Sequence, residues 1–328
     1  MPENRRLPAH LAGPPPPRHL RRVPTYASHV LMIEPVRFRF NPETAASNVF
    51  QFQEPPTEAE ADAIALQAPE QHRRLRDLLV ANGVYVTAAR SRDQTPDAPF
   101  CNNWFSTHFA VGSTPATLVL YPLLAPNRRL ERRGDLVELF RAAYPRMVDL
   151  SGHEREARYL ESTGSLCLDH ANRVAYAALS PRTDRALAEE WARQLDYQLV
   201  AFTATDDHGV PYYHTNVMMF LGHGVAGVTL EAITDPAERQ DVERALAAGG
   251  FEILAIARSQ AAQFCGNCLA LTNDEGTPLL VMSSAAYHGF AAGQRTVLER
   301  HATLLHSDLS SFERLAGGSA RCLLAELF

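Results

Sequence analysis

The sequence predicts a single α/β domain built from short strand pairs, each accompanied by one helix. Three observations indicate this fold class. Apolar, strand-like runs alternate with helix-like runs from Ala27 to the last residue. No linker rich in Pro, Gly or Ser interrupts this stretch, so we expect one catalytic domain over 27–328. Strand pairs recur with one helix per unit, a pattern that fits simple βαβ winding poorly.

The N-terminal residues 1–26 are expected to lie outside this domain. They are basic, rich in proline and without an apolar run, so we expect no secretory signal there. We expect a disordered extension at 1–26, because such a segment cannot bury enough apolar surface to fold.

The predicted strands are apolar segments rich in β-branched and aromatic residues. In chain order they are 29–38, 83–89, 116–124, 165–180, 197–204, 215–230, 251–257, 267–273, 278–284 and 320–328. The predicted helices lie between them, and the first begins with Thr57 as N-cap before a Glu-rich run. The helices are 57–82, 132–143, 184–195, 236–248, 291–304 and 308–315. No sequence repeat is evident, although this regular recurrence permits a structural one.

The composition argues against several classes of function. A net charge of −6 offers no basic surface for nucleic acid. No run approaches the ~20 apolar residues of a membrane helix, so we expect no membrane partner. The 5 cysteines are odd in number and scattered, which favours a reducing compartment, the cytoplasm. No Gly-rich phosphate loop is present, so we expect no nucleotide cofactor.

The segment "GGSARC" at 317–322 makes Cys322 a candidate nucleophile. Two glycines allow a sharp turn before it, and the neighbouring Arg321 supplies a positive charge that favours the thiolate. A buried cysteine chosen for packing is the alternative interpretation.

A nucleophilic cysteine requires a base and a group that orients the base. His214 opens an apolar strand after a Pro-Tyr-Tyr turn, and Glu161 precedes a tight Gly turn. The segment "DAPFCNNWFSTH" at 97–108 places two asparagines among aromatic residues. It is either a structured turn or a wall that binds a neutral group.

Taken together, the ordered segments resemble the guanidino-group-modifying enzymes, the pentein superfamily, and within it the citrulline-hydrolase (citrullinase) branch. The segments that carry this resemblance are 36–51, "FCNNWFSTH" (100–108), 120–133, "ESTG" (161–164), "LSPRTD" (179–184), "YHTNVMM" (213–219), "SSAAY" (283–287) and "GGSARC" (317–322). The resemblance implies a five-bladed α/β propeller of ββαβ units, with the active site in a central channel.

The resemblance also implies roles for single residues. Cys322 matches the nucleophile, His214 the general acid and base, and Glu161 the acidic residue of the E-x-x-G turn. Ser162 stands in that turn where many relatives have glycine, which affects the expected shape of the turn.

The remaining implied roles concern substrate binding. Asn103 and Asn216 stand where arginine deiminases carry aspartates. Arg182 matches an arginine that binds the substrate α-carboxylate, and Arg128 or Arg129 falls near a second one.

The expected reaction is hydrolysis of citrulline to ornithine, carbon dioxide and ammonia through a covalent intermediate on Cys322. His214 would protonate the leaving amine and then activate water. The expected partner is a small amino-acid substrate, no metal or other cofactor is expected, and a homo-oligomer is left open. "CGNC" at 265–268 lacks the second pair that a zinc site requires, and a thioredoxin-like context is missing.

Three alternatives remain at this point. One is a guanidine enzyme of the same superfamily, an arginine deiminase or amidinotransferase. Another is a non-catalytic pentein that acts as a binding protein. The last is a papain-like thiol hydrolase, in which the cysteine would precede the histidine.

Overall fold

The computed structural model describes residues 25–48, 50–52 and 54–328, so most of the extension predicted at 1–26 lies outside the described residues. Five three-stranded sheets organise the chain, in the orders β15-β1-β2, β3-β4-β5, β6-β7-β8, β9-β10-β11 and β12-β13-β14. The strands are β1 (His29–Glu34), β2 (Tyr85–Arg90), β3 (Phe105–His108), β4 (Thr117–Leu120), β5 (Arg146–Asp149), β6 (Cys167–Asp169), β7 (Val174–Ala178), β8 (Gln198–Phe202), β9 (Met219–Leu221), β10 (Val225–Val228), β11 (Glu252–Ala255), β12 (Leu269–Thr272), β13 (Pro278–Ser283), β14 (Thr303–Ser307) and β15 (Ala325–Glu326).

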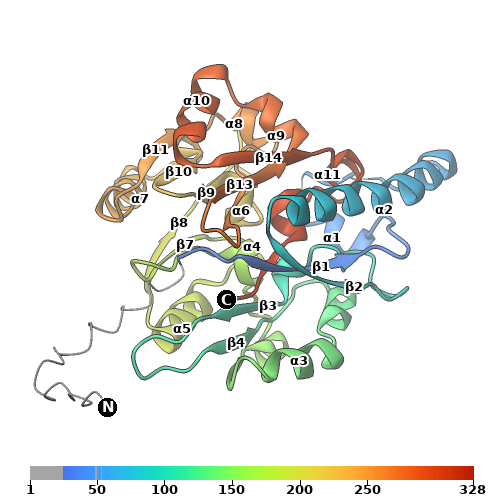
Figure 1. The fold of residues 1–328 in the computed structure, drawn as a ribbon, viewed down its shortest axis with the longest axis horizontal. Coiled ribbons are helices and arrows are strands. Elements are labelled where there is room, and N and C mark those ends of the chain that lie inside the picture. The colour runs from blue at the N-terminus through green and yellow to red at the C-terminus, as the bar shows by residue number, and fades with distance from the viewer. Residues whose placement is uncertain (1–24, 49, 53) are drawn as a thin grey trace, which may run out of the picture.

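Each sheet is one ββαβ unit. Its middle strand runs antiparallel to one neighbour and parallel to the other. A parallel pair needs a crossover connection, and here it contains a helix in every unit. The crossover helices are α2 (Glu58–Ala81), α3 (Gly134–Arg141), α5 (Arg185–Leu195), α7 (Pro236–Ala248), and α9 (Ser284–Gly289) with α10 (Ala292–His301). The predicted five-bladed pentein propeller is confirmed, and Figure 1 shows the blades around the central helices α4 (Ser162–Ser165) and α6 (Thr215–Met218).

The first blade is assembled from both ends of the described chain. Strand β15 pairs antiparallel with β1 in the register Val30↔Glu326, and β1 pairs parallel with β2. The strand that follows Cys322 therefore closes the ring of blades.

The longest helix shows how local sequence determines a crossover. Thr57 accepts a hydrogen bond from the Glu60 backbone N–H, while the Glu60 carboxylate accepts one from the Thr57 N–H, so α2 begins with a capping box as the N-cap prediction required. Its buried face includes Ile64, Leu75 and Leu79, which pack in the core of the first blade. None of the helices in the described residues is both long and apolar enough to cross a bilayer.

Three short strands were not predicted. Strands β3 and β5 have only four residues each, and their sequences, FSTH and RMVD, lack the apolar run used to recognise strands. Strand β14 was assigned to the end of the predicted helix 291–304, whereas α10 ends at His301 and the chain then extends. Tertiary pairing, rather than local propensity, makes these segments strands.

Short segments at the centre precede the first strand of each blade. Besides α4 and α6 they are the 3₁₀ turns η1 (Cys101–Asn103) and η5 (Ala320–Leu323), and the turn 262–268 that follows α8. The other helical elements are α1 (Pro42–Ala45), α8 (Arg258–Ala261), α11 (Ser310–Ala316), η2 (Pro126–Glu131), η3 (Ser151–Glu156) and η4 (Leu230–Ala232). Polar residues from different blades are thereby brought to one central point.

Candidate active site

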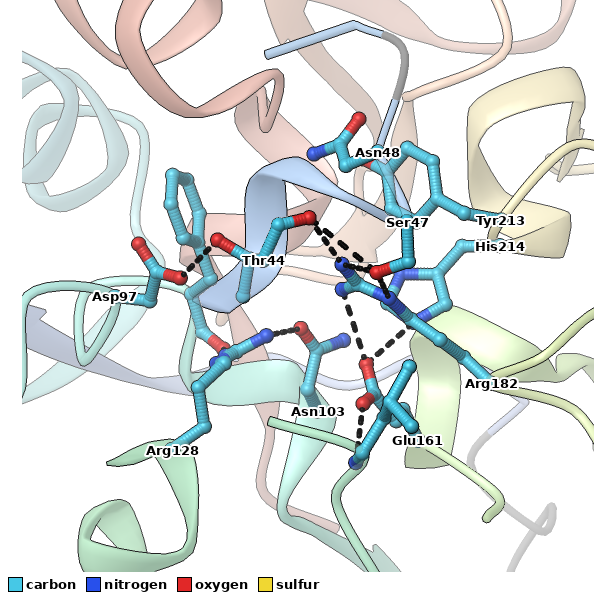
Figure 2. A network of polar contacts seen from close by, with 12 residues as sticks. Thr44, Ser47, Asn48, Asp97, Asn103, Arg128, Glu161, Arg182, Tyr213 and His214 are labelled. Atoms are coloured by element: carbon cyan, nitrogen blue, oxygen red, sulfur yellow. Dashed lines mark hydrogen bonds and ion pairs between the residues drawn. The ribbon is translucent and has the colours of Figure 1, made fainter. Parts of the chain in front are cut away.

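One central cavity contains most of the residues singled out from the sequence. Figure 2 shows the polar network around it. The residues that line the cavity are Thr44, Asn48, Asp97, Phe100, Asn103, Arg128, Arg182, Tyr213, His214, Ala316, Gly318 and Cys322. Segments more than 200 residues apart in the chain, such as those of Asn103 and Cys322, therefore meet here.

Glu161 and His214 form a buried pair, 0% and 1% exposed. The Nε2–H of His214 donates to Glu161 Oε2 at 2.8 Å, and Arg182 Nη1 approaches the same oxygen at 3.4 Å. The second carboxylate oxygen, Oε1, accepts the backbone N–H of Leu124 at 3.0 Å. Both oxygens of Glu161 are thus engaged, and the His214 ring is held in one orientation.

The pKa values of both members of this pair are lowered. Burial opposes ionisation of Glu161, but the charge of Arg182 and the hydrogen bond from His214 hold the pKa of this carboxyl well below its usual value. Burial lowers the pKa of His214 to about 4, although Glu161 acts in the opposite direction. His214 is therefore neutral near pH 7 and can accept a proton.

The E-S-T-G turn has the shape that a glycine would adopt without strain. Ser162 has φ of 45°, in the left-handed region, and its Oγ–H donates to the Phe105 carbonyl at 2.7 Å. This hydrogen bond helps a non-glycine residue hold the conformation. Gly164 is required for a different reason, because an added Cβ would lie 2.4 Å from Asn103 Nδ2 and 2.7 Å from the His214 ring.

The orientation of the Asn103 amide is determined by Arg128. Arg128 Nη1 donates to Asn103 Oδ1 at 2.8 Å, and a guanidinium can only donate. The Nδ2 group of Asn103 must therefore point the other way, toward Gly164 and the His214 ring. It has no hydrogen-bond partner among the described residues. Arg128 is held in turn by Glu131, through Nε at 2.9 Å and Nη2 at 3.0 Å.

Arg182 connects the Glu161–His214 pair to the segment 41–48, which lies over the cavity. Its Nη2 donates to Ser47 Oγ at 2.7 Å and to the Thr44 carbonyl at 3.2 Å, and its guanidinium lies 5.0 Å from the Tyr213 ring centre. Figure 2 shows Arg182 between this segment and Glu161. The same segment is fastened by Asn48, whose Nδ2 donates to the Ala316 carbonyl at 2.9 Å.

The two glycines before Cys322 are explained by close packing. Gly317 has φ of 63°, and an added Cβ would lie 2.7 Å from the backbone at residues 50 and 51. At Gly318 a Cβ would meet the Phe100 ring at 2.4 Å. Cys322 itself is 3% exposed. The glycines therefore let the segment that carries Cys322 pass under the segment that covers the cavity.

The family model described as "N,N dimethylarginine dimethylhydrolase, eukaryotic" matches residues 34–328. The chain belongs to this family. The resemblance to the guanidino-group-modifying enzymes of the pentein superfamily is therefore confirmed at the level of the superfamily. Comparison with curated protein sequences gave no match.

Solved structures support the fold of this dimethylhydrolase family member. The N-terminal domain of ArgZ bound to product, an arginine dihydrolase of cyanobacteria, has a TM-score of 0.70 at 17% identity, with 92% of this chain and 97% of that one covered. Unliganded AgrE has a TM-score of 0.70 at 19% identity, with 92% and 39% covered. A dimethylarginine dimethylaminohydrolase adduct with S-methyl-L-thiocitrulline has a TM-score of 0.63 at 15% identity, with 92% and 100% covered. The chain spans only 40% of the full-length ArgZ chain.

Two arginines of this family member lie elsewhere than the sequence suggested. Arg129 does not line the cavity; its Nε and Nη2 donate to the carbonyls of Leu123 and Leu124 at 3.0 and 3.2 Å. Arg321 was expected to support a thiolate, but its guanidinium pairs with Glu326 at 2.7 Å and donates to the Leu324 carbonyl at 2.9 Å. Its charge is therefore neutralised by a carboxylate.

Asn216 lies behind Cys322 rather than on the wall of the active-site cavity. Its Nδ2 is 3.7 Å from Cys322 Sγ, and its Oδ1 has no partner among the described residues. Asn216 lines a second cavity, together with His170 and Arg321. The structure thus brings together Cys322, His214, Glu161, Asn103, Arg128 and Arg182, with Asn216 in contact with the sulfur from behind.

Sequence reasoning missed several polar residues of the site, among them Asp97 and Asn267. Asp97 lines the cavity; its Oδ2 accepts from Asn41 Nδ2 at 2.7 Å, and its Oδ1 has no partner among the described residues. Its place at the start of the 97–108 segment was the available signal. Asn267 contacts Cys322 Sγ at 3.3 Å and was overlooked because "CGNC" was considered only for its sulfurs. Within the part of the chain that the structure describes, no group of three or more metal-binding side chains occurs.

Proposed function

We propose that this protein is a cysteine-dependent hydrolase that cleaves the ureido group of citrulline to ornithine, carbon dioxide and ammonia. The observation that carries the proposal is the contact from Arg128 to Asn103 Oδ1 at 2.8 Å. It leaves the buried N–H donors of the amide facing His214 and the cavity. A donor at this position suits an oxygen atom on the substrate.

A neutral ureido group fits this wall better than a guanidinium. A cationic substrate group requires carboxylates that can pair with it. Glu161 already accepts from His214, Arg182 and the Leu124 backbone. Asn103 presents a donor, which a guanidinium cannot use because it has no acceptor.

The chemistry proceeds by covalent catalysis at Cys322. The thiol proton passes to neutral His214, and Sγ attacks the ureido carbon, so that a carbon–sulfur bond forms and the carbonyl oxygen becomes an oxyanion. Asn103 Nδ2 donates to this oxygen, and an aligned donor of this kind contributes about 10²–10³ in rate. His214 returns the proton to the departing nitrogen as its bond to carbon breaks. It then takes a proton from water, which attacks the carbamoyl carbon and releases Sγ.

The amino-acid end of the substrate would be held by charged groups on the same cavity wall. Arg128 and Arg182 each line the cavity, and Asp97 Oδ1 is a buried acceptor without a partner among the described residues. Guanidinium N–H groups suit an α-carboxylate, and a carboxylate oxygen suits an α-ammonium. This grip is remote from the reacting carbon and positions it.

A second candidate is a hydrolase that starts from a guanidino substrate. Family membership favours it, because the family description names N,N-dimethylarginine. Two structural relatives point the same way, since ArgZ is described as an arginine dihydrolase and the other as a dimethylarginine dimethylaminohydrolase. An arginine dihydrolase would carry out two successive hydrolyses, the second on a citrulline formed in place. We also propose a reducing compartment, the cytoplasm, because all five cysteines are free thiols.

The deciding experiment compares three substrates with one preparation of enzyme. Citrulline, arginine and N,N-dimethylarginine are each incubated with the protein, and ornithine, citrulline and ammonia are measured over time. The proposal expects ornithine from citrulline at a kcat/KM far above that for the other two. Ornithine with two ammonia molecules from arginine would select the dihydrolase, and citrulline from dimethylarginine would select the dimethylhydrolase. Inertness toward all three would revive the binding-protein alternative.

A further inference from the structure

Four blades supply a polar side chain to the centre from the segment just before their first strand. These are Asn103 before β3, Glu161 before β6, His214 before β9 and Cys322 before β15. The fifth blade begins with β12 at Leu269, and the turn before it carries Asn267, which is 1% exposed. The structural repeat thus places Asn267 at the one central position to which no role has been given.

The orientation of the Asn267 amide is fixed by a backbone donor. Its Oδ1 accepts the Arg321 N–H at 3.0 Å, and a backbone N–H can only donate. Its Nδ2 group donates to the Asn216 carbonyl at 2.9 Å and lies 3.3 Å from Cys322 Sγ. A longer contact of 3.7 Å joins Sγ to Asn267 Oδ1. One hydrogen of Nδ2 is therefore directed at the sulfur.

The surroundings of Sγ give this donor its importance. Arg321, the cation adjacent in sequence, is paired with Glu326. Among the described residues, the hydrogen-bond partners of Sγ are the amides of Asn267 and Asn216, and the Asn267 donor is the nearer, at 3.3 Å against 3.7 Å. Hydrogen bonds to a charged form favour that form.

The rest of the "CGNC" segment serves to place this amide. An added Cβ on Gly266 would lie 2.3 Å from the Val217 carbonyl and 2.8 Å from the Met218 backbone, so only glycine allows the turn to pack against the His-Thr-Asn segment. Cys265 and Cys268 are buried, and their thiols contact the carbonyls of Ala286 and Cys265 at 3.4 Å. Of the four residues of this motif, Asn267 is the one that contacts Cys322 Sγ.

We propose that Asn267 is a catalytic residue that stabilises the thiolate of Cys322 through its Nδ2–H, while hydrogen bonds to the Arg321 N–H and the Asn216 carbonyl hold its amide in place. The amide keeps its own protons throughout; the thiol proton passes to His214. The same donor stabilises the sulfur again when it leaves the carbamoyl carbon. This role rests on the proposed covalent mechanism but on neither particular substrate.

The test measures the thiolate directly, without substrate. In Asn267→Asp the acceptor for the Arg321 N–H is kept, while an oxygen replaces the donor that faces Sγ. We expect the rate of Cys322 alkylation by iodoacetamide at pH 7 to fall about tenfold to a hundredfold, and the alkylation and 240 nm absorbance profiles to move toward higher pH. Asn267→Ser, which retains a small donor, should give a smaller loss, and Cys268→Ala, in the same motif, should match the wild type.

The outcomes separate this inference from the proposed function. Alkylation profiles of folded Asn267→Asp and Asn267→Ser that coincide with the wild type would overturn the role of Asn267. If the aspartate variant does not fold, as judged by circular dichroism, Asn267→Ser and Asn267→Ala carry the same comparison. A shifted profile in a protein that leaves citrulline intact would instead retain the role of Asn267 and reject the citrulline assignment.

Discussion

Arg128 donates to Asn103 Oδ1 at 2.8 Å while Glu131 binds the other side of the guanidinium, so a buried ion pair determines which end of the Asn103 amide faces His214 and the cavity. The side chain of Asn103 cannot flip without placing two donors against each other. In the proposed reaction, selectivity at the ureido carbon therefore depends on Arg128, which orients the Asn103 amide and need not touch that carbon.

Asn103→Asp tests this arrangement. The new carboxylate would still accept from Arg128 but would present an oxygen, in place of a donor, to the substrate carbonyl. We expect kcat/KM for citrulline to fall about 10²–10³-fold, with any gain confined to arginine. Steady-state kinetics with both substrates measure the change. Asn102→Asp, a buried neighbour that contacts Thr163 and does not line the cavity, is the control for burying a charge, and equal losses in both variants would contradict the assignment.

Cys322→Ser should retain the fold and lose nearly all turnover, because a serine hydroxyl is far less ionised than a thiol. Burial raises the pKa of Cys101, Cys167 and Cys265 to about 12, so these remain thiols at pH 8. Iodoacetamide should therefore modify Cys322 first, as read by peptide mass spectrometry, and activity should be lost in step. Cys265→Ser serves as the matched control and should remain active. Activity that survives modification of Cys322 would remove it from the mechanism.

Arg182→Lys should raise KM for citrulline about tenfold to a hundredfold with a smaller effect on kcat. The change keeps the charge but replaces a planar fork, which reaches both Glu161 and Ser47, by a single ammonium. Arg129→Lys is the control, since Arg129 binds the carbonyls of Leu123 and Leu124 outside the cavity. Equal KM changes in the two variants would place the carboxylate grip elsewhere.

The His72→Leu substitution tests the pH dependence of stability far from the site. His72 is buried on α2, neither ring nitrogen has a partner among the described residues, and burial lowers its pKa from 6.5 to about 4. In the unfolded chain the His72 ring binds a proton below pH 6.5, whereas in the native state it binds this proton only near pH 4. Stability is therefore full above pH 6.5 and is lost as the pH falls through this window, by up to about 3 kcal/mol from this residue.

Urea unfolding at pH 7, 6 and 5 measures the effect. His72→Leu should lose less stability between pH 7 and pH 5 than the wild type, whereas replacement of the exposed His208 by Gln should change nothing. Identical pH dependence in wild type and His72→Leu would show that the His72 ring does not resist protonation in the folded protein.

Most of the fold and much of the site could be anticipated from the sequence. Helix 236–248 was predicted with the bounds that α7 has, and Thr57 caps α2 as expected, because capping and periodicity are local properties. The edge strands β3 and β5 escaped, since four residues that pair through tertiary contacts carry little signal of their own.

The site residues divide in a similar way. Glu161, His214 and Cys322 stand in segments whose order along the chain resembles that of the pentein superfamily. These three residues could therefore be predicted from the sequence. Asn267 could not be found in this way, because its role depends on a contact with a backbone 54 residues later in the chain. The charge of Arg321 was misjudged for a related reason: its partner, Glu326, lies on β15, and only pairing of that strand shows where the guanidinium points.

The pairing of β15 with β1 has a consequence for when the enzyme becomes competent. Val30 and Glu326 pair although almost the whole given sequence lies between them, and closing such a loop costs conformational entropy. Cys322 stands directly before the strand that makes this closure. The residues proposed for substrate binding and proton transfer all precede Cys322 in the chain, so they are synthesised first, and the sulfur joins them only when β15 docks. Detachment of β15 alone would carry the proposed nucleophile away from the other blades, so the proposed activity would report on whether the ring of blades is closed.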